Sequence, residues 1–187
     1  MQRGFKAEAE KAAAAGRQLL GIAALAPFDP WAYASQLGIF ILDFNSLGLP
    51  AGAVRQLTVV DGDSWSAMTL KEVEKLGIVL NPAHAMTRQR YDLMHELAHV
   101  ELEHVPARVE VSQTGLLLLS DYSDDQEQEA DWYAAAFLLP RDGIYRLRSR
   151  GKTAAEIAAQ FGVSKALCEY RLRMTGIDVQ IRRASTR

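Results

Sequence analysis

Cysteine is almost absent from this sequence: among its 187 residues only Cys168 carries a thiol, so no disulfide can form within the chain. Disulfides persist mainly in oxidising compartments, and this usage therefore fits a reducing one. Long hydrophobic runs are missing as well. The uncharged stretches near the N-terminus, residues 18–28 and 30–42, are too short to span a bilayer. We expect a cytoplasmic protein with neither a signal peptide nor a membrane anchor.

Histidine is also scarce, with four residues in the chain, yet two of them bracket a glutamate in an H-E-x-x-H motif at residues 95–99. On an α-helix, His95 and His99 lie about 40° apart around the axis and about 6 Å apart along it, so both rings can reach one metal ion. Glu96 points to the flank of that face, which suits the general base of a metalloprotease better than a third ligand. The alternative is a helix that merely contains two histidines.

The other two histidines are poorer candidates. His104 comes one residue too early for the third ligand of a metzincin, and on a continued helix it would point about 180° away from His95. We therefore reject His104 as a ligand. His84 lies in a predicted loop, where it could assist a substrate carbonyl but where a lone histidine is more often a surface residue.

An acidic helix downstream offers the missing ligand. Glu127 and Asp131 fall on its inward-facing stripe, whereas Glu129 is expected to face solvent. Buried carboxylates are costly unless they bind a metal or a polar partner, so Glu127 as ligand and Asp131 as acceptor for a ligand imidazole would account for both. The alternative is an ordinary acidic helix start that complements the helix dipole.

The pattern of apolar residues predicts an α+β protein. Residues 5–25 and 31–37 read as helices, and residues 39–44 read as a strand. A hairpin over residues 55–70 and a strand over 77–81 follow. The sequence therefore predicts a small antiparallel sheet that precedes the metal helix and packs on it.

Charge is distributed unevenly along the chain. Residues 1–140 contain 10 Lys and Arg against 19 Asp and Glu, whereas residues 141–187 contain 11 against 4. We predict a metallopeptidase domain over 1–140 and a basic helical segment over 141–187.

The basic segment resembles a helix-turn-helix, with helices over 153–160 and 164–173. Its expected small core consists of Ile157, Ala158, Phe161, Val163, Cys168 and Leu172. Lys165, Arg171 and Arg173 are its candidate nucleic-acid contacts. Arg171 occupies a position where an apolar residue is often needed. The alternative is a helical hairpin that packs on the peptidase and exposes a solvated basic face.

Several motifs together resemble the ImmA/IrrE family of bacterial and phage metallopeptidases. These motifs are Asn81, Arg88-Gln-Arg90-Tyr91, His95-Glu-Leu-Ala-His99 and Glu127-x-x-Ala-Asp131-x-x-Ala-Ala-x-x-Leu-Leu-Pro140. The likeness covers most of residues 29–175. The sequence departs from the family at Asp92, where threonine is usual, and at Ala98, where glycine is common, and neither change touches the chemistry.

The resemblance implies a zincin-like fold in which His95, His99 and Glu127 bind the metal and Glu96 is catalytic. It also implies regulated cleavage of a helix-turn-helix transcriptional repressor. We therefore predict a zinc endopeptidase with one Zn²⁺ per chain, although Mn²⁺ or another divalent ion could take the same ligands.

Three points stay open from sequence alone. The residue that stabilises the oxyanion could be Tyr133, Tyr122 or His84. Two other functions also fit the sequence: a DNA-binding regulator with a structural metal, and a partner that sequesters a repressor without cutting it.

Overall fold

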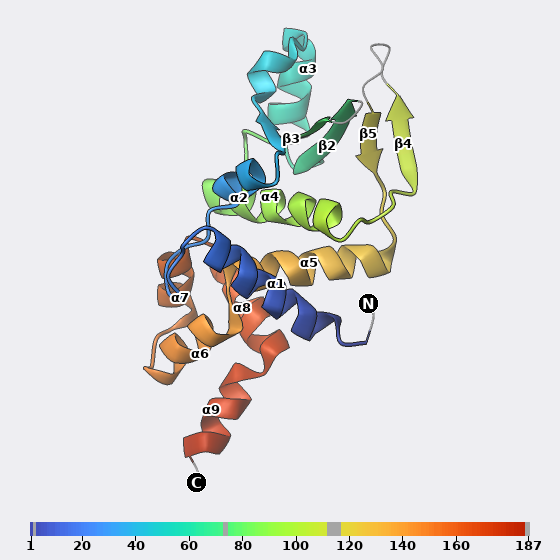
Figure 1. Ribbon diagram of the computed structural model, residues 1–187. Coiled ribbons are helices and arrows are strands. Elements are labelled where there is room, and N and C mark those ends of the chain that lie inside the picture. The colour runs from blue at the N-terminus through green and yellow to red at the C-terminus, as the bar shows by residue number, and fades with distance from the viewer. Residues whose placement is uncertain (2, 73–74, 112–116, 186–187) are drawn as a thin grey trace. The chain divides into compact units, whose positions relative to one another are not determined.

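The chain forms two compact units of mixed α and β structure. The computed structural model describes residues 1, 3–72, 75–111 and 117–185 (Figure 1). Unit 1 comprises Met1 and Asp29–Asp131, and unit 2 comprises Gln2–Phe28 and Trp132–Arg187. This division differs from the predicted boundary after residue 140, because the N-terminal helix belongs with the C-terminal helices. Within the described ranges, no helix combines the length and apolar character that crossing a membrane requires.

Unit 1 contains a five-stranded sheet in the order β1-β3-β2-β5-β4. Its strands are β1 (Phe40–Leu42), β2 (Ala67–Glu72), β3 (Lys75–Leu80), β4 (Arg108–Val111) and β5 (Leu117–Ser120). β1 pairs with β3 in parallel, and the other pairs are antiparallel. The sheet is therefore mixed, which corrects the prediction of an antiparallel one. Two of its strands, β4 and β5, also follow the helix that carries the H-E-x-x-H motif instead of preceding it.

The prediction that the first strand of a hairpin begins at residue 55 is wrong. Residues 51–60 form helix α3 (Ala51–Arg55) and the π-helical turn η2 (Gln56–Val60). Val54 and Leu57, three residues apart, pack against a core of Phe44, Leu70 and Val79. A helix presents residues at this spacing on one face, so burial of this pair favours the helix over the β-branched preference of the segment.

Helix α4 (Met86–Glu101) carries the H-E-x-x-H motif and packs on β2 and β3 (Figure 1). Side chains alternate across these strands, so Thr69 and Ile78 share the face toward α4 while Leu70 lies in the opposite core. Gly77 allows β1 to approach, because a Cβ there would lie 2.8 Å from a Leu42 methyl carbon. Helix α2 (Pro30–Gln36) and the 3₁₀ turn η1 (Phe44–Leu47) complete this unit.

Unit 2 is helical. It contains α1 (Phe5–Leu19), the second half of α5 (Asp124–Leu138), α6 (Arg141–Ser149), α7 (Ala154–Phe161), α8 (Lys165–Thr175) and α9 (Ile177–Ser185). Thr153 and Glu156 cap α7 reciprocally, Gly162 turns the chain at φ 67°, and Ser164 caps α8. The predicted small core of this segment is buried: Ile157, Ala158, Phe161, Val163, Cys168 and Leu172.

Candidate metal centre

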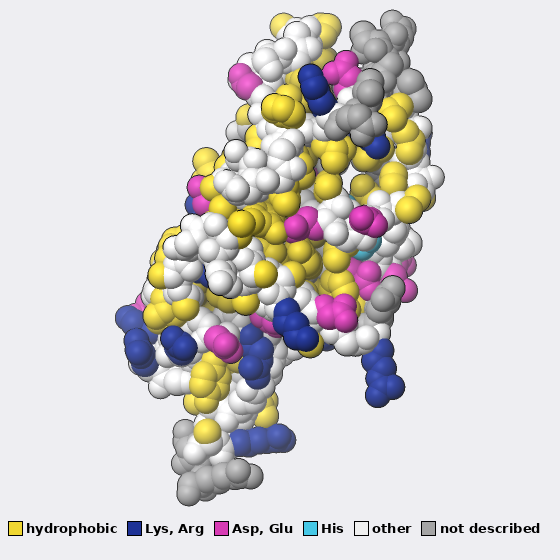
Figure 2. Space-filling model, in the orientation of Figure 1, with side chains coloured by type: hydrophobic (Ala, Val, Ile, Leu, Met, Phe, Trp, Pro, Cys, Tyr) yellow, Lys and Arg dark blue, Asp and Glu magenta, His cyan; other side chains and the backbone are white. Residues whose placement is uncertain are grey.

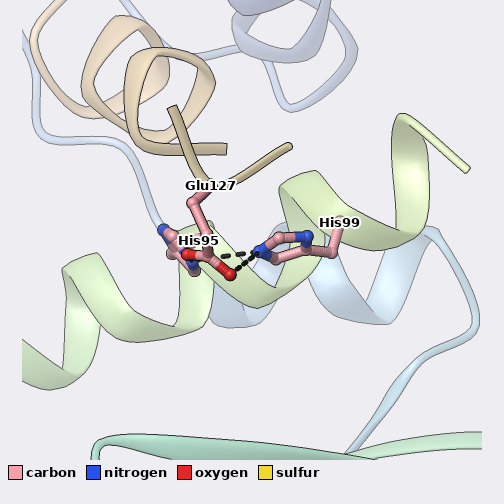
Figure 3. Close-up of side chains that lie close together, drawn as sticks. All are labelled: His95, His99 and Glu127. Carbon is pink, nitrogen blue, oxygen red and sulfur yellow. Dashed lines mark hydrogen bonds and ion pairs between the residues drawn. The ribbon is translucent and has the colours of Figure 1, made fainter. Parts of the chain in front are cut away.

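Three side chains of unit 1 direct nitrogen and oxygen atoms at one point: His95 and His99 from α4, and Glu127 from the start of α5 (Figure 3). The Nε2 atoms of the two histidines lie 3.0 Å apart, and the Glu127 oxygens lie 3.2 Å from His95 Nε2 and 3.7 Å from His99 Nε2. Ligand atoms around a tetrahedral zinc ion lie about 3.4 Å from one another. The three side chains could therefore hold one divalent ion with little movement.

Asp131 lies one turn beyond Glu127 and faces the outer nitrogen of His95. Its Oδ1 is 3.1 Å from His95 Nδ1 and accepts a 2.6 Å hydrogen bond from the Tyr91 hydroxyl. Burial lowers the pKa of His95, but the hydrogen bonds with Asp131 and Glu127 outweigh burial and raise this pKa to about 10. The structure thus brings Asp131 to the His95 imidazole and surrounds that imidazole with negative charge.

His99 is enclosed more completely, with 2% of its side chain exposed. Its ring stacks on Tyr122 at a centroid distance of 3.7 Å, and its Nδ1 lies 2.9 Å from His104 Nδ1. Burial, followed by the nearby charge of His95, lowers the pKa of His99. The imidazole is therefore neutral, which is the form that binds metal ions.

The expected orientation of His104 is wrong, because α4 does not continue that far. The helix ends at Glu101, and Glu103 adopts a left-handed φ of 52°. The chain reverses there and carries the His104 ring back to His99. Glu129 is also not directed to solvent as expected, since its side chain is 12% exposed and lies 3.6 Å from His104 Nε2.

Glu96 lies on the sheet side of α4, where its Oε2 accepts a hydrogen bond from the Thr69 hydroxyl of β2. Burial raises the pKa of Glu96 above its usual range. A carboxylate with a raised pKa accepts protons more readily near neutral pH. The hydrogen bond from Thr69 also limits the orientations available to the carboxylate.

A cleft of about 400 Å³ opens onto these groups. It is lined by Ser66, Ala67, Met68, Tyr91, Asp92, His95, Glu96, His99, Leu118, Leu119, Asp121, Tyr122, Glu127 and Asp131. Figure 2 shows Asp and Glu side chains beside a small exposed histidine surface. Unit 1 supplies this whole lining, so the cleft belongs to one compact body. The cleft is open to solvent.

Of the three residues predicted as possible oxyanion donors, Tyr122 alone is among the described residues that line this cleft. Burial, with smaller effects from Glu96 and Glu127, raises its pKa to about 12, so the phenol stays protonated and can donate. Tyr133 is a buried residue of unit 2. His84 is also buried, 3.2 Å from the Gly62 carbonyl and 3.4 Å from Asp92, which corrects its expected surface position.

Two functional neighbours of the centre were not identified from sequence. Tyr91 precedes His95 by four residues, so its helical spacing could have placed it on the same face. Thr69 comes from a strand 26 residues before His95 in the sequence, and no local pattern links them. Long-range pairing of this kind becomes visible only in the folded sheet.

The three candidate nucleic-acid contacts have different environments. Arg171 is fully buried: it donates to the Leu139 carbonyl over 3.1 Å and pairs with Glu10. Its assignment as a nucleic-acid contact is therefore corrected, because no surface is left for a phosphate to reach. Lys165, 64% exposed, and Arg173 remain at the surface of α8.

The family model described as Peptidase_M78, IrrE N-terminal-like domain, matches residues 53–173, a range that includes both motif helices. No curated protein matches the sequence.

Proposed function

Because the chain belongs to the Peptidase_M78 family, we propose that it is a zinc-dependent endopeptidase whose metal ligands are His95, His99 and Glu127. The observation that carries this proposal is the convergence of these three donors beside Glu96 in an open cleft. When bound, the ion would supply Lewis acidity toward a peptide carbonyl and toward water. The donor set favours zinc and also accepts Mn²⁺ or another divalent ion.

Glu96 is the general base of this proposal. It takes a proton from the attacking water and passes the proton to the leaving amine. Burial raises its pKa, which makes the carboxylate a stronger base toward the attacking water. Thr69 holds one carboxylate oxygen so that the other can face the cleft. Tyr122 is the proposed donor to the developing oxyanion, since it lines the cleft and keeps its proton.

An extended peptide fits the cleft better than a helix. β5 pairs with β2 only over Thr69–Lys71, whereas β3 pairs with the whole of β2. Ala67 and Met68, which line the cleft, thus have a paired strand on one side only among the described residues. An unpaired strand edge recognises an added strand through its backbone groups. We infer that the substrate presents a locally unfolded or extended segment.

We propose a zincin-like fold and a cytoplasmic enzyme that cleaves a helix-turn-helix repressor under regulation. Unit 1 carries 6 Lys and Arg against 17 Asp and Glu, a net charge of −11. Such a field favours encounter with a basic protein, and a DNA-binding repressor is basic.

The test is incubation of the full chain with a candidate repressor, with and without a chelator, followed by mass spectrometry. Wild-type protein should make a discrete cut, and Glu96→Gln should cut about 10²-fold more slowly or less while it retains the metal. Equal cleavage by both proteins would overturn the mechanism. A stable complex with intact repressor would favour a sequestering function instead.

A further inference from the structure

His104 occupies the outer side of a proposed metal ligand. The His99 ring has two nitrogens, and His99 Nε2 faces His95 and Glu127 at the centre. His99 Nδ1 faces away from the centre, 2.9 Å from His104 Nδ1. His104 Nε2 in turn lies 3.6 Å from a Glu129 oxygen, which is longer than a hydrogen bond but within ion-pair range.

Only one arrangement of protons agrees with these contacts when a metal is bound. His99 Nε2 must then offer a lone pair, so the proton of the neutral ring sits on Nδ1. That N–H can donate only to an unprotonated nitrogen, which places the His104 proton on Nε2, toward the Glu129 carboxylate. All donors in this series therefore point outward, from His99 through His104 to Glu129.

We infer that His104 is a positioning residue that fixes the tautomer and ring orientation of His99, with Glu129 selecting the tautomer of His104. This inference rests on the proposed metal site. A ligand imidazole whose outer N–H is held by an acceptor is a better and more rigid ligand than one whose N–H is free.

The local fold supports a fixed position for His104. Its backbone N–H donates to the His99 carbonyl over 3.0 Å, directly after the left-handed Glu103. Its side chain is 6% exposed, so water does not compete freely for the contact with His99. Tyr122 stacks on the face of the His99 ring and limits tilting of the ring plane. The contact with His104 at the ring edge limits rotation of His99 within that plane.

The two histidine ligands differ in what holds their outer nitrogens. His95 meets a carboxylate directly, at Asp131, whereas His99 meets a neutral imidazole backed by Glu129. Loss of Glu129 should therefore weaken the metal site less than loss of His104, because the imidazole still accepts the bond without the carboxylate.

Zinc affinity, measured by competition with a chromophoric chelator, tests this inference in the full chain. His104→Phe, which cannot accept the bond, should weaken zinc binding about 10- to 100-fold. His104→Gln should recover part of that loss, since its side-chain oxygen can accept from His99. Glu129→Gln should cost less than about tenfold. The absorption spectrum of the Co²⁺-loaded protein should change in His104→Phe, because it reports ligand geometry.

His84→Asn is the matched control. His84 is another buried imidazole of unit 1 that lies beside a carboxylate, at Asp92, but it does not line the cleft. Its replacement should lower thermal stability and leave zinc affinity and the Co²⁺ spectrum unchanged. An equal loss of affinity in His84→Asn and His104→Phe would show a general folding effect and overturn the inference.

The failure of this inference can be told apart from failure of the proposed function. If His99→Ala abolishes zinc binding while folded His104→Phe and His104→Gln bind as wild type, only the role of His104 is wrong. If His95→Ala and His99→Ala retain full affinity, the ligand assignment itself fails, and the role of His104 fails with it.

Discussion

The two units of the chain differ in both charge and chemistry. Unit 1 has a net charge of −11 and contains all four histidines, whereas unit 2 has 15 Lys and Arg against 6 Asp and Glu, a net charge of +9, and no histidine. Figure 2 shows several Lys and Arg side chains over the helices of unit 2. The imidazoles of the chain, and the cluster of His95, His99 and Glu127 that could hold a metal ion, therefore lie in the acidic unit.

Part of the positive charge of unit 2 is buried and does not lie on its surface. Arg17 is 5% exposed and donates to the carbonyls of Phe137, Ala23 and Ala26, and Arg171 is fully buried. Both guanidinium groups donate to carbonyls at the end of α5, where helical partners are lacking, and Arg17 also donates to carbonyls in the loop after α1. A count of basic residues therefore overestimates the surface that a nucleic acid could use.

The largest expected effect comes from removal of a ligand in unit 1. Glu127→Ala should lose stoichiometric zinc and all measurable cleavage, because two histidines alone leave the ion underligated. Elemental analysis of protein purified without added metal checks this. Asp124→Ala, at an exposed position of the same helix, should retain both properties. Full zinc content in Glu127→Ala would show that the acidic helix does not contribute the third ligand.

A smaller effect should follow from loss of a buried guanidinium in unit 2. Arg171→Met leaves the Leu139 carbonyl and Glu10 without this donor, and should lower the free energy of unfolding by about 2–4 kcal/mol. Urea unfolding measures this change. Arg173→Met, two residues away and exposed, should change it by less than about 0.5 kcal/mol. Similar values for the two variants would mean that burial of Arg171 contributes little.

How far the sequence predicts this molecule depends on whether the determining contacts are local. Helical spacing places His95 beside His99 and Glu127 beside Asp131, and the structure brings all four together. These relationships span one turn of a helix, so periodicity suffices to find them. The α+β class and the buried core of α7 and α8 were predicted for the same reason.

Predictions failed where the structure depends on a contact between residues far apart in the sequence, or where a helix ends without a sequence signal. Helix α4 ends without the glycine that commonly marks a helix end, and Glu103 takes the left-handed conformation instead. The sequence therefore carries no signal for the turn that positions His104. Residues 51–60 have a β-branched composition but fold as helix against a distant core. Arg171 is buried and forms an ion pair with Glu10 of the first helix, far away in the sequence.

Metal affinity in unit 1 should depend on pH. The raised pKa of His95, about 10, means that both ring nitrogens are protonated at neutral pH, and a metal must displace the proton on Nε2, the nitrogen that faces the centre. Affinity should therefore fall about tenfold for each pH unit between pH 8 and pH 6. Calorimetric titration in two buffers should show about one proton released per ion. Asp131→Asn removes a cause of the raised pKa and should flatten this dependence.

The smallest expected effect concerns the exposed basic residues of α8. If unit 2 binds duplex DNA, Lys165 and Arg173 are the candidate phosphate contacts that remain at the surface. Binding of the full chain should weaken with salt, and the double variant Lys165→Ala, Arg173→Ala should reduce the slope of log affinity against log salt by about 2, since each phosphate contact contributes about 0.9. Arg171→Met, if folded, should leave the slope unchanged because its guanidinium reaches no phosphate. Absence of binding at 50 mM salt, or an equal slope in the double variant, would mean that the basic face of unit 2 is only solvated.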